Sequence, residues 1–239
     1  MVALRVICGF RDVATETAGV LAGVPPLALL AKMYATKYAR RVELLQKGLV
    51  ENNLREALVN SERQARQQLL LDWEQHLDEP RAAVQKVVAV IRPHLQVWLQ
   101  NGVGHLTYRV TQVLTGHGCF GEYLCRIGKE PTAHCHACGA VSDSAEHTVE
   151  ECLRWADDRR ELAANIGVDL SLNGLLKALA SGAEEKWRAA EETLAAVTLL
   201  LVVKTVLSVV KEEMTVLLEV MVIQVPEVFY TKNQEDRKR

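Results

Sequence analysis

Three cysteines and one histidine between residues 135 and 152 constrain this chain more than any other feature of its sequence. Cys135, Cys138, His147 and Cys152 have the spacing Cys-x2-Cys-x8-His-x4-Cys. Three thiolates and one imidazole at such spacings are typical of tetrahedral Zn²⁺ sites. Gly139, directly after the second cysteine, can relieve the backbone of a tight turn. Because the protein then fills all four positions of the tetrahedron, the pattern predicts a structural zinc ion and not a catalytic one.

Two further histidines, His134 and His136, flank the first cysteine of this motif and are alternative ligands. Both lie too close to Cys135 along the chain to complete the same coordination shell without strain. His147 is therefore the predicted fourth ligand.

The cysteines outside the motif are Cys8, Cys119 and Cys125. Cys119 and Cys125 lie among glycine, apolar and aromatic residues, so we expect small buried side chains and neither ligands nor a disulfide. Thiolates that are reserved for a metal ion require a reducing compartment, which predicts a nuclear or cytoplasmic protein.

Composition and periodicity together predict a mainly α fold with a small irregular zinc-knuckle subdomain. Hydrophobic residues make up 49% of the 239 residues, which is enough for a sizeable core. Apolar residues recur at helical spacing, and alternating strand patterns are almost absent. The formal charge of −2 excludes a global basic field, so any surface that binds nucleic acid must be local.

Proline positions and apolar periodicity predict a series of helices. They cover residues 15–24, 27–34, 35–78 as one helix or two, 84–91, 106–114, 145–164 and 170–192. Residues 35–78 are rich in arginine and lysine. We interpret that stretch as a solvated face with glutamate partners such as Glu43 and Glu62, and a phosphate-contacting face is the alternative.

The apolar segment 194–210 is the one candidate for a membrane helix. It is about 17 residues long, at the short limit for a span. It contains Lys204 and has charged clusters on both sides. We therefore expect a buried helix, or a surface for a protein partner, and not a membrane partner. The polar tail, residues 232–239, is expected to be disordered. The first residues lack the apolar region and cleavage site of a signal peptide.

Three stretches of the sequence resemble the C-terminal region of non-LTR retrotransposon reverse transcriptases, and most closely those of the insect elements that insert into ribosomal DNA. Residues 114–124 read LTGHGCFGEYL, residues 145–155 read AEHTVEECLRW, and the Cys-x2-Cys pair lies between them. Residues 13–27, VATETAGVLAGVPPL, look like the segment just beyond the polymerase palm of the same proteins. The resemblance covers roughly residues 1–192.

The resemblance implies a division of the chain and a role for each part. Residues 1–113 would be a helical, thumb-like region that follows the palm, and residues 114–156 the Cys-Cys-His-Cys zinc knuckle. Residues 157–192 would be a helical extension, and residues 193–239 an apolar helix and charged tail of uncertain origin. The resemblance also implies that Cys135, Cys138, His147 and Cys152 are the metal ligands.

Polymerase activity itself is not expected from this chain. The two-metal chemistry of polymerases requires carboxylates on a palm sheet, which the family carries upstream of the region that this sequence resembles. The run Trp155-Ala156-Asp157-Asp158 mimics the Tyr-x-Asp-Asp motif of that family. It lies in a helical context without flanking β-branched residues, so we do not interpret it as catalytic.

Two functions remain open from the sequence. In the first, the zinc knuckle assists the binding of RNA or DNA. Single-stranded nucleic acids are bound by stacking and by basic contacts, and the candidate contacts are Tyr123, Arg126, Lys129 and Arg154. In the second, the zinc ion only stabilises the fold, and the helices contact the polymerase or another protein. The loop between Cys138 and His147 is not basic, which weakens the first hypothesis.

Overall fold

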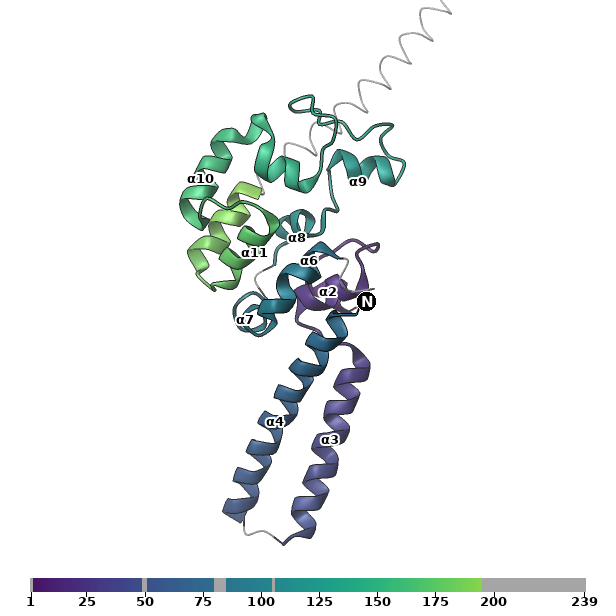
Figure 1. Ribbon diagram of the computed structural model, residues 1–239, viewed down its shortest axis with the longest axis vertical. Coiled ribbons are helices and arrows are strands. Elements are labelled where there is room, and N and C mark those ends of the chain that lie inside the picture. The colour runs from purple at the N-terminus through teal and green to yellow at the C-terminus, as the bar shows by residue number, and fades with distance from the viewer. Residues whose placement is uncertain (1, 49–50, 80–84, 105, 195–239) are drawn as a thin grey trace, which may run out of the picture. The chain divides into compact units, whose positions relative to one another are not determined.

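The structure is a computed structural model that describes residues 2–48, 51–79, 85–104 and 106–194, and every regular element in these ranges is helical (Figure 1). The predicted mainly α fold is therefore confirmed. The described residues belong to one compact unit, Met1–Ala195. Its elements are α1 (Val2–Val6), α2 (Thr15–Ala22), α3 (Leu27–Gln46), α4 (Glu51–Leu77), α6 (Lys86–Ile91), the 3₁₀ turn η1 (Arg92–His94), α7 (Leu95–Asn101), α8 (Tyr108–Thr115), α9 (Gly121–Arg126), the π turn η2 (His147–Glu151), the 3₁₀ turn η3 (Leu153–Trp155), α10 (Ala156–Ile166) and α11 (Leu172–Ala180).

Glycine and proline set the helix ends in the first part of the chain, and the break at the prolines was predicted. Gly23 ends α2 in the left-handed conformation with φ of 65°, where a side chain would add strain. Its backbone N–H donates to the Val20 carbonyl, and the N–H of Val24 donates to Gly19. Two prolines follow, and α3 begins directly after Pro26, a position that proline tolerates well.

Residues 27–77 form a helical hairpin of α3 and α4, which pack side by side in Figure 1. The sequence predicted a separate helix over residues 27–34 and left open whether residues 35–78 form one helix or two. The boundary near residue 34 is wrong, because α3 continues to Gln46, and residues 35–78 are divided between α3 and α4. Ion pairs join Lys32 to Asp72 at 2.7 Å and Lys37 to Glu62 at 2.9 Å across the hairpin. The expected pairing with glutamates such as Glu62 is thus observed.

The core lies where α2, α6, α7 and α11 meet. Trp98 on α7 is fully buried, and its indole N–H donates to the Val20 carbonyl of α2 at 3.1 Å. Its ring lies 6.2 Å from that of Trp187, in the helical stretch 184–194. Gly102 allows this packing, because a Cβ atom there would lie 2.5 Å from the Trp98 ring. Other fully buried side chains are Trp73, Leu77, Leu95, Leu175 and Leu179.

The single helix predicted for residues 170–192 is wrong, because the chain breaks after α11. Gly182 takes a left-handed φ of 74°, and helix resumes at residue 184. Asn101 donates its side-chain amide to the Ala180 carbonyl at 3.0 Å, and so satisfies an acceptor that the helix end leaves open. A neighbour distant in sequence therefore stabilises this break.

Three further expectations can be compared with the structure. Cys119 and Cys125 are free thiols as predicted, but they are half-buried and not fully enclosed. No single helix among the described residues is long and apolar enough to cross a membrane; the bent pair α2 and α3, at 51°, meets the length and composition criteria only when taken together. The apolar segment 194–210, apart from Leu194, and the tail lie outside the described residues.

Replacing Thr111 with valine should lower the free energy of unfolding by about 1–3 kcal/mol. The Thr111 hydroxyl on α8 donates to the Ile7 carbonyl at 2.6 Å, and both residues are buried. Valine keeps the shape but leaves that carbonyl without its donor. Urea unfolding measures the difference. Thr36→Val is the matched control, because the Thr36 hydroxyl is exposed and bonds only within α3; equal effects of the two changes would contradict the prediction.

Candidate metal centre

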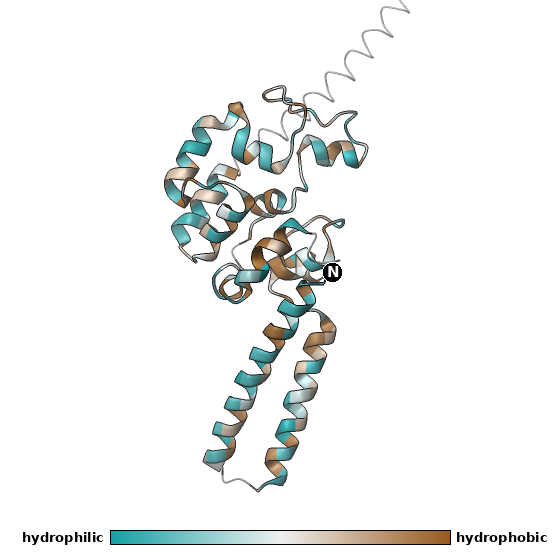
Figure 2. Ribbon diagram, in the orientation of Figure 1, coloured by the Kyte–Doolittle hydropathy of each residue, from teal (hydrophilic) through white to brown (hydrophobic). Residues whose placement is uncertain are grey.

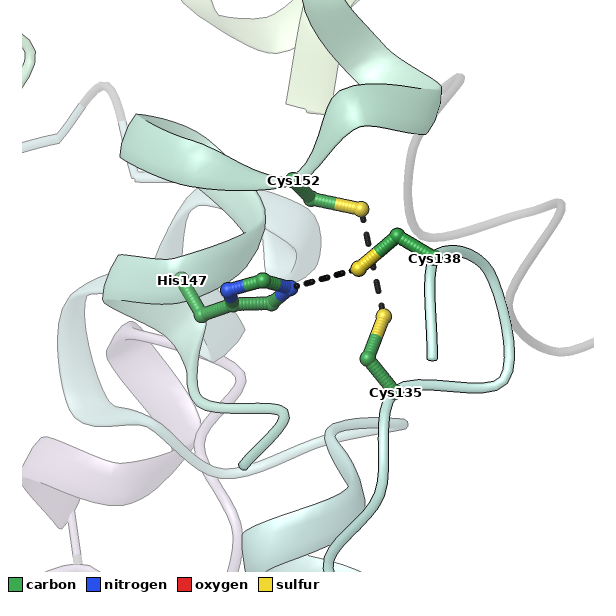
Figure 3. A group of neighbouring side chains, drawn as sticks. All are labelled: Cys135, Cys138, His147 and Cys152. Carbon is green, nitrogen blue, oxygen red and sulfur yellow. Dashed lines mark hydrogen bonds between the residues drawn. The ribbon is translucent and has the colours of Figure 1, made fainter. Parts of the chain in front are cut away.

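Four side chains from two separate segments converge on one point (Figure 3). Cys135 and Cys138 come from a loop, and His147 and Cys152 come from the helical segment that follows it. Their donor atoms all lie within 4.8 Å of one another. The sulfur atoms of Cys135 and Cys152 are 3.8 Å apart, and the Cys138 sulfur lies 3.3 Å from Nε2 of His147. This cluster could hold a metal ion, and the cysteines are free thiols in it.

A tight turn presents the first two thiols. The backbone N–H of Cys135 donates to the Ala140 carbonyl at 2.8 Å, and the N–H of Gly139 donates back to the Cys135 carbonyl at 2.8 Å. Gly139 has a φ of 81°, as its position after the second cysteine predicted. The turn therefore holds Cys135 and Cys138 on the same side of the loop.

The helical segment that carries His147 departs from the prediction. Ser144 caps the start of this segment, because its hydroxyl accepts a hydrogen bond from the His147 N–H at 2.9 Å. The chain then forms a π turn, in which the N–H of Cys152 donates to the carbonyl of His147 at 2.8 Å. Cys152 itself leaves the helix, with φ of −57° and ψ of 121°. The continuous helix expected from residue 145 to about 164 is therefore wrong.

The break at Cys152 has a local cause. A continuous α-helix would turn the residues after His147 away from the loop thiols, whereas the wider π turn and the extended Cys152 bring that sulfur beside Cys135. The carbonyl oxygens that lose their helical partners at the break are satisfied by a side chain. Arg159 on α10 donates to the carbonyls of Cys152 and Glu151. Helix α10 then begins at Ala156, after the short turn η3.

The contacts of its two ring nitrogens set the orientation of the His147 side chain. Nε2 faces the Cys138 sulfur, and Nδ1 faces the carboxylate of Glu151 at 3.4 Å. A carboxylate beside the outer nitrogen of a ligating histidine is a common feature of metal sites. His136, the alternative ligand, instead contacts Glu130 at 2.6 Å and is not part of the cluster.

Asp143 links the cluster to the helix before it, and the sequence did not reveal this role. Its carboxylate is buried. One oxygen accepts the backbone N–H of Gly121 at the start of α9, and the other accepts the Thr148 hydroxyl, both at 3.1 Å. The structure shows that Asp143 caps α9, whereas Ser144 caps the helical segment of His147.

The three thiols differ in acidity. Burial raises the pKa of Cys135 to about 12 and also raises the pKa of Cys152. The backbone N–H of Ala140 lowers the pKa of Cys138 to about 7. Cys138 is therefore readily available as a thiolate near neutral pH, and a cation that enters the cluster displaces protons from the other two.

The four predicted nucleic-acid contacts do not form one surface of free side chains. Tyr123 is buried, and its hydroxyl donates to Asp12 at 3.2 Å, so its ring has no open face for a stacked base. Arg126 is exposed and lies over the Tyr123 ring, 5.1 Å from its centre. Lys129 is exposed, and Arg154 lies over the Trp155 ring. The placement of Tyr123 does not fit a stacking role, whereas the three cations remain accessible.

The Asp157-Asp158 pair has the helical context that the sequence indicated. Both residues lie in the first turn of α10, where negative charge complements the helix dipole. Asp157 forms an ion pair with Arg160 of the same helix. An ordinary structural role accounts for this pair.

No protein-family model, no curated protein and no solved structure matches this chain. The likeness to reverse transcriptases therefore depends on the sequence motifs alone.

Replacing Asp143 with alanine should weaken metal retention and unfold the segment around the cluster at a lower temperature. Alanine removes two acceptors and leaves the Gly121 N–H unpaired, at a cost of about 1–3 kcal/mol. Asp143→Asn keeps only one acceptor oxygen and should have an intermediate effect. The measurement is the rate at which a chelator strips the metal, together with the melting temperature. Asp157→Ala, on the exposed first turn of α10, is the control, and a chelation rate for Asp143→Ala equal to this control would contradict the assigned role.

Proposed function

We propose that this chain is the C-terminal portion of a non-LTR retrotransposon reverse transcriptase, in which Cys135, Cys138, His147 and Cys152 bind one structural Zn²⁺. The family assignment is supported by the motifs around residues 114–124 and 145–155. The zinc assignment is supported by the convergence of the four donor atoms within 4.8 Å. That convergence is the observation on which the proposal depends.

The spacing of the donors fits zinc. A tetrahedral ion with Zn–S bonds of about 2.3 Å separates two sulfur ligands by about 3.8 Å. The Cys135 and Cys152 sulfurs are 3.8 Å apart. A disulfide would require about 2.05 Å. Thiolate and imidazole donors are the ligands that zinc prefers, whereas magnesium and calcium prefer oxygen.

The ion would stabilise the fold and would not take part in a reaction. Four protein donors fill the coordination shell, so no position is left for water or substrate. Two of the thiols, Cys135 and Cys152, are buried. A bound ion of this kind joins the loop to the helical segment, and the free energy of binding becomes free energy of folding. Ligation by thiolates also supports a reducing location, the cytoplasm or the nucleus.

Replacing Cys138 with serine should reduce the zinc content of the purified protein from one ion per chain to less than about one tenth of that. A hydroxyl is a poor zinc ligand, and Cys138 is the thiol whose pKa is already lowered. His136→Ala should leave the zinc content unchanged, because His136 lies outside the cluster. Elemental analysis of the dialysed proteins measures both.

Two more variants make this test sharper. Cys125→Ser applies the same chemical change to a half-buried thiol outside the cluster and should retain zinc. His147→Cys should also retain zinc, because four thiolates form an equally common structural site. Full zinc content in Cys138→Ser would show that the ligand set is wrong.

A second candidate function is contact with single-stranded nucleic acid, and it is favoured by one observation. Arg126, Lys129 and Arg154 are exposed, and they flank the four donors in the sequence. In the structural alternative these are ordinary surface residues. Carboxylates such as Asp12, 3.8 Å from Arg126, reduce the positive potential there. We therefore rank the structural role first.

If the second function holds, a single-stranded RNA should bind about 20-fold more weakly at 200 mM than at 50 mM salt. Three phosphate contacts at about 0.7 counterions each give this dependence. The variant Arg126→Gln/Lys129→Gln/Arg154→Gln should bind more weakly at low salt and lose most of the salt dependence. Fluorescence anisotropy measures both.

The control for this titration replaces Arg40, Lys47 and Arg66 with glutamine, which removes the same charge at residues of the α3–α4 hairpin that already pair with carboxylates. Equal loss of binding in both triple variants would indicate a non-specific charge effect. No binding at the lower salt concentration would leave the structural role as the only function of the centre.

A further inference from the structure

Helix α3 exposes a line of large apolar and aromatic side chains. Leu27, Tyr34, Tyr38 and Leu45 are 82%, 61%, 72% and 54% exposed. At about 100° per residue, all four lie within about 20° of one line that runs along the helix. The line from Leu27 to Leu45 is about 27 Å long. Small exposed residues fill the area beside this line: Ala28, Ala31, Ala35 and Ala39. We refer to these eight residues as the α3 face.

The α3 face is distinct from the side of the helix that packs on α4. Leu44 is buried, and Lys37 reaches across the hairpin to Glu62. These two residues lie roughly a quarter turn away from the line of Leu27 and Tyr34. In Figure 2, α4 is mostly hydrophilic, whereas α3 carries more hydrophobic residues along its length. A helix with two apolar sides a quarter turn apart is typical of a helix packed between two neighbours.

The charges around the α3 face argue against nucleic acid as its occupant. Four of the five basic side chains between residues 32 and 47 are in ion pairs. Lys32 and Lys37 pair with carboxylates of α4, and Arg40 and Lys47 both pair with Glu43. A site that stacks bases on tyrosine needs cations that are available to phosphate. Arg41, exposed and about 40° from the line, is the one of these five side chains without an ion pair among the described residues. The Lys37 ammonium already lies over the Tyr34 ring, 5.6 Å from its centre. One unpaired cation beside apolar area and two aromatic rings suits a protein partner better than a phosphate backbone.

The order of residues on the α3 face is symmetric about residue 36. Leu27 and Leu45 lie nine residues on either side of it, and Tyr34 and Tyr38 lie two residues on either side. A second copy that runs antiparallel therefore brings Leu27 opposite Leu45 and Tyr34 opposite Tyr38, and each of these two pairs occurs twice in the dimer. This is the condition for an interface with twofold symmetry, in which residue i contacts j and j contacts i.

We propose that the α3 face is the interface of an antiparallel homodimer of this chain. The alanines allow the two helix backbones to approach closely, and the tyrosine pairs form the centre. The leucine pairs close both ends. The proposal is independent of the zinc ion and of nucleic-acid binding, because none of its residues belongs to the metal cluster.

The first test is the mass of the full chain by sedimentation equilibrium over a range of concentrations. The unchanged chain should reach the mass of a dimer. Tyr38→Glu should raise the dissociation constant at least about tenfold, because it buries a carboxylate opposite a tyrosine ring. Val59→Glu is the control, since Val59 is exposed on the other helix of the hairpin, and should leave the dissociation constant unchanged within about twofold. Circular dichroism checks that both variants keep their helix content.

The second test determines the direction of the pairing. Leu27→Glu and Leu45→Lys should each weaken the dimer. Glutamate at the start of α3 and lysine at its end both complement the helix dipole, so neither change disfavours the helix itself. In the double variant an antiparallel dimer brings opposite charges together at both ends and should recover affinity, whereas a parallel dimer would bring like charges together.

Three outcomes would overturn the proposal. They are a monomer at every concentration, a dimer that is equally sensitive to Tyr38→Glu and Val59→Glu, and a double variant weaker than both single variants. A loss of RNA binding in Tyr38→Glu without any change in mass would assign the face to nucleic acid and would also overturn it.

Discussion

The convergence of three thiols and one imidazole on a single point is the constraint on which the segment from residue 127 to 155 depends. This segment contains few buried apolar side chains of its own, and two of its buried residues are the donors Cys135 and Cys152. It also lacks regular α-helix apart from the two residues before His147. Such a segment cannot bury enough apolar area to offset its loss of conformational entropy. The donors meet there in place of a hydrophobic core, and a metal ion bound by them would join the loop to the helical segment.

The cluster reaches the rest of the molecule through a few polar contacts. Asp143 connects it to the first residue of α9, and Tyr123 on α9 connects in turn to Asp12 near the N-terminus. On the other side, Glu146 pairs with Lys86 at the start of α6 at 2.5 Å. Burial is the largest influence on the pKa of Glu146 and raises it, but the hydrogen bond and charge of Lys86, together with hydrogen bonds from the backbone and from Ser144, lower the pKa overall. This carboxylate therefore stabilises the fold above its ordinary pKa, and the contribution is lost as the pH falls through the lowered value.

The sequence was most informative where a single residue type decides the local backbone. Pro25 and Pro26 separate α2 from α3, and Gly139 allows the turn after the two cysteines. It failed where the deciding partner is distant. Periodicity predicted helix through Cys152, but the need to place its sulfur beside Cys135 overrides that preference. The break after α11 depends in the same way on Asn101, and the role of Asp143 depends on Gly121. Such partners cannot be identified from one sequence, because spacing along the chain does not report contacts across it.

The α3–α4 hairpin shows a different limit, since its helices were predicted but one of its surfaces was not. Counting apolar positions finds the side that packs on α4, and it treats tyrosine and alanine on a second side as ordinary surface. Among the side chains that the structure describes in this pair, only Leu44 on α3, and Ala65, Trp73 and Leu77 on α4, are buried. The ion pairs across it are exposed or half-exposed and contribute little to its stability.

Two long helices with so little burial gain stability from any further packing, because the stability of a helix in a protein comes mainly from the packing of one face. Each leucine or tyrosine of the α3 face that becomes buried would add about 1.5–3 kcal/mol by removal of apolar area from water. The same exposed residues that leave the hairpin poorly packed alone are therefore a driving force for association.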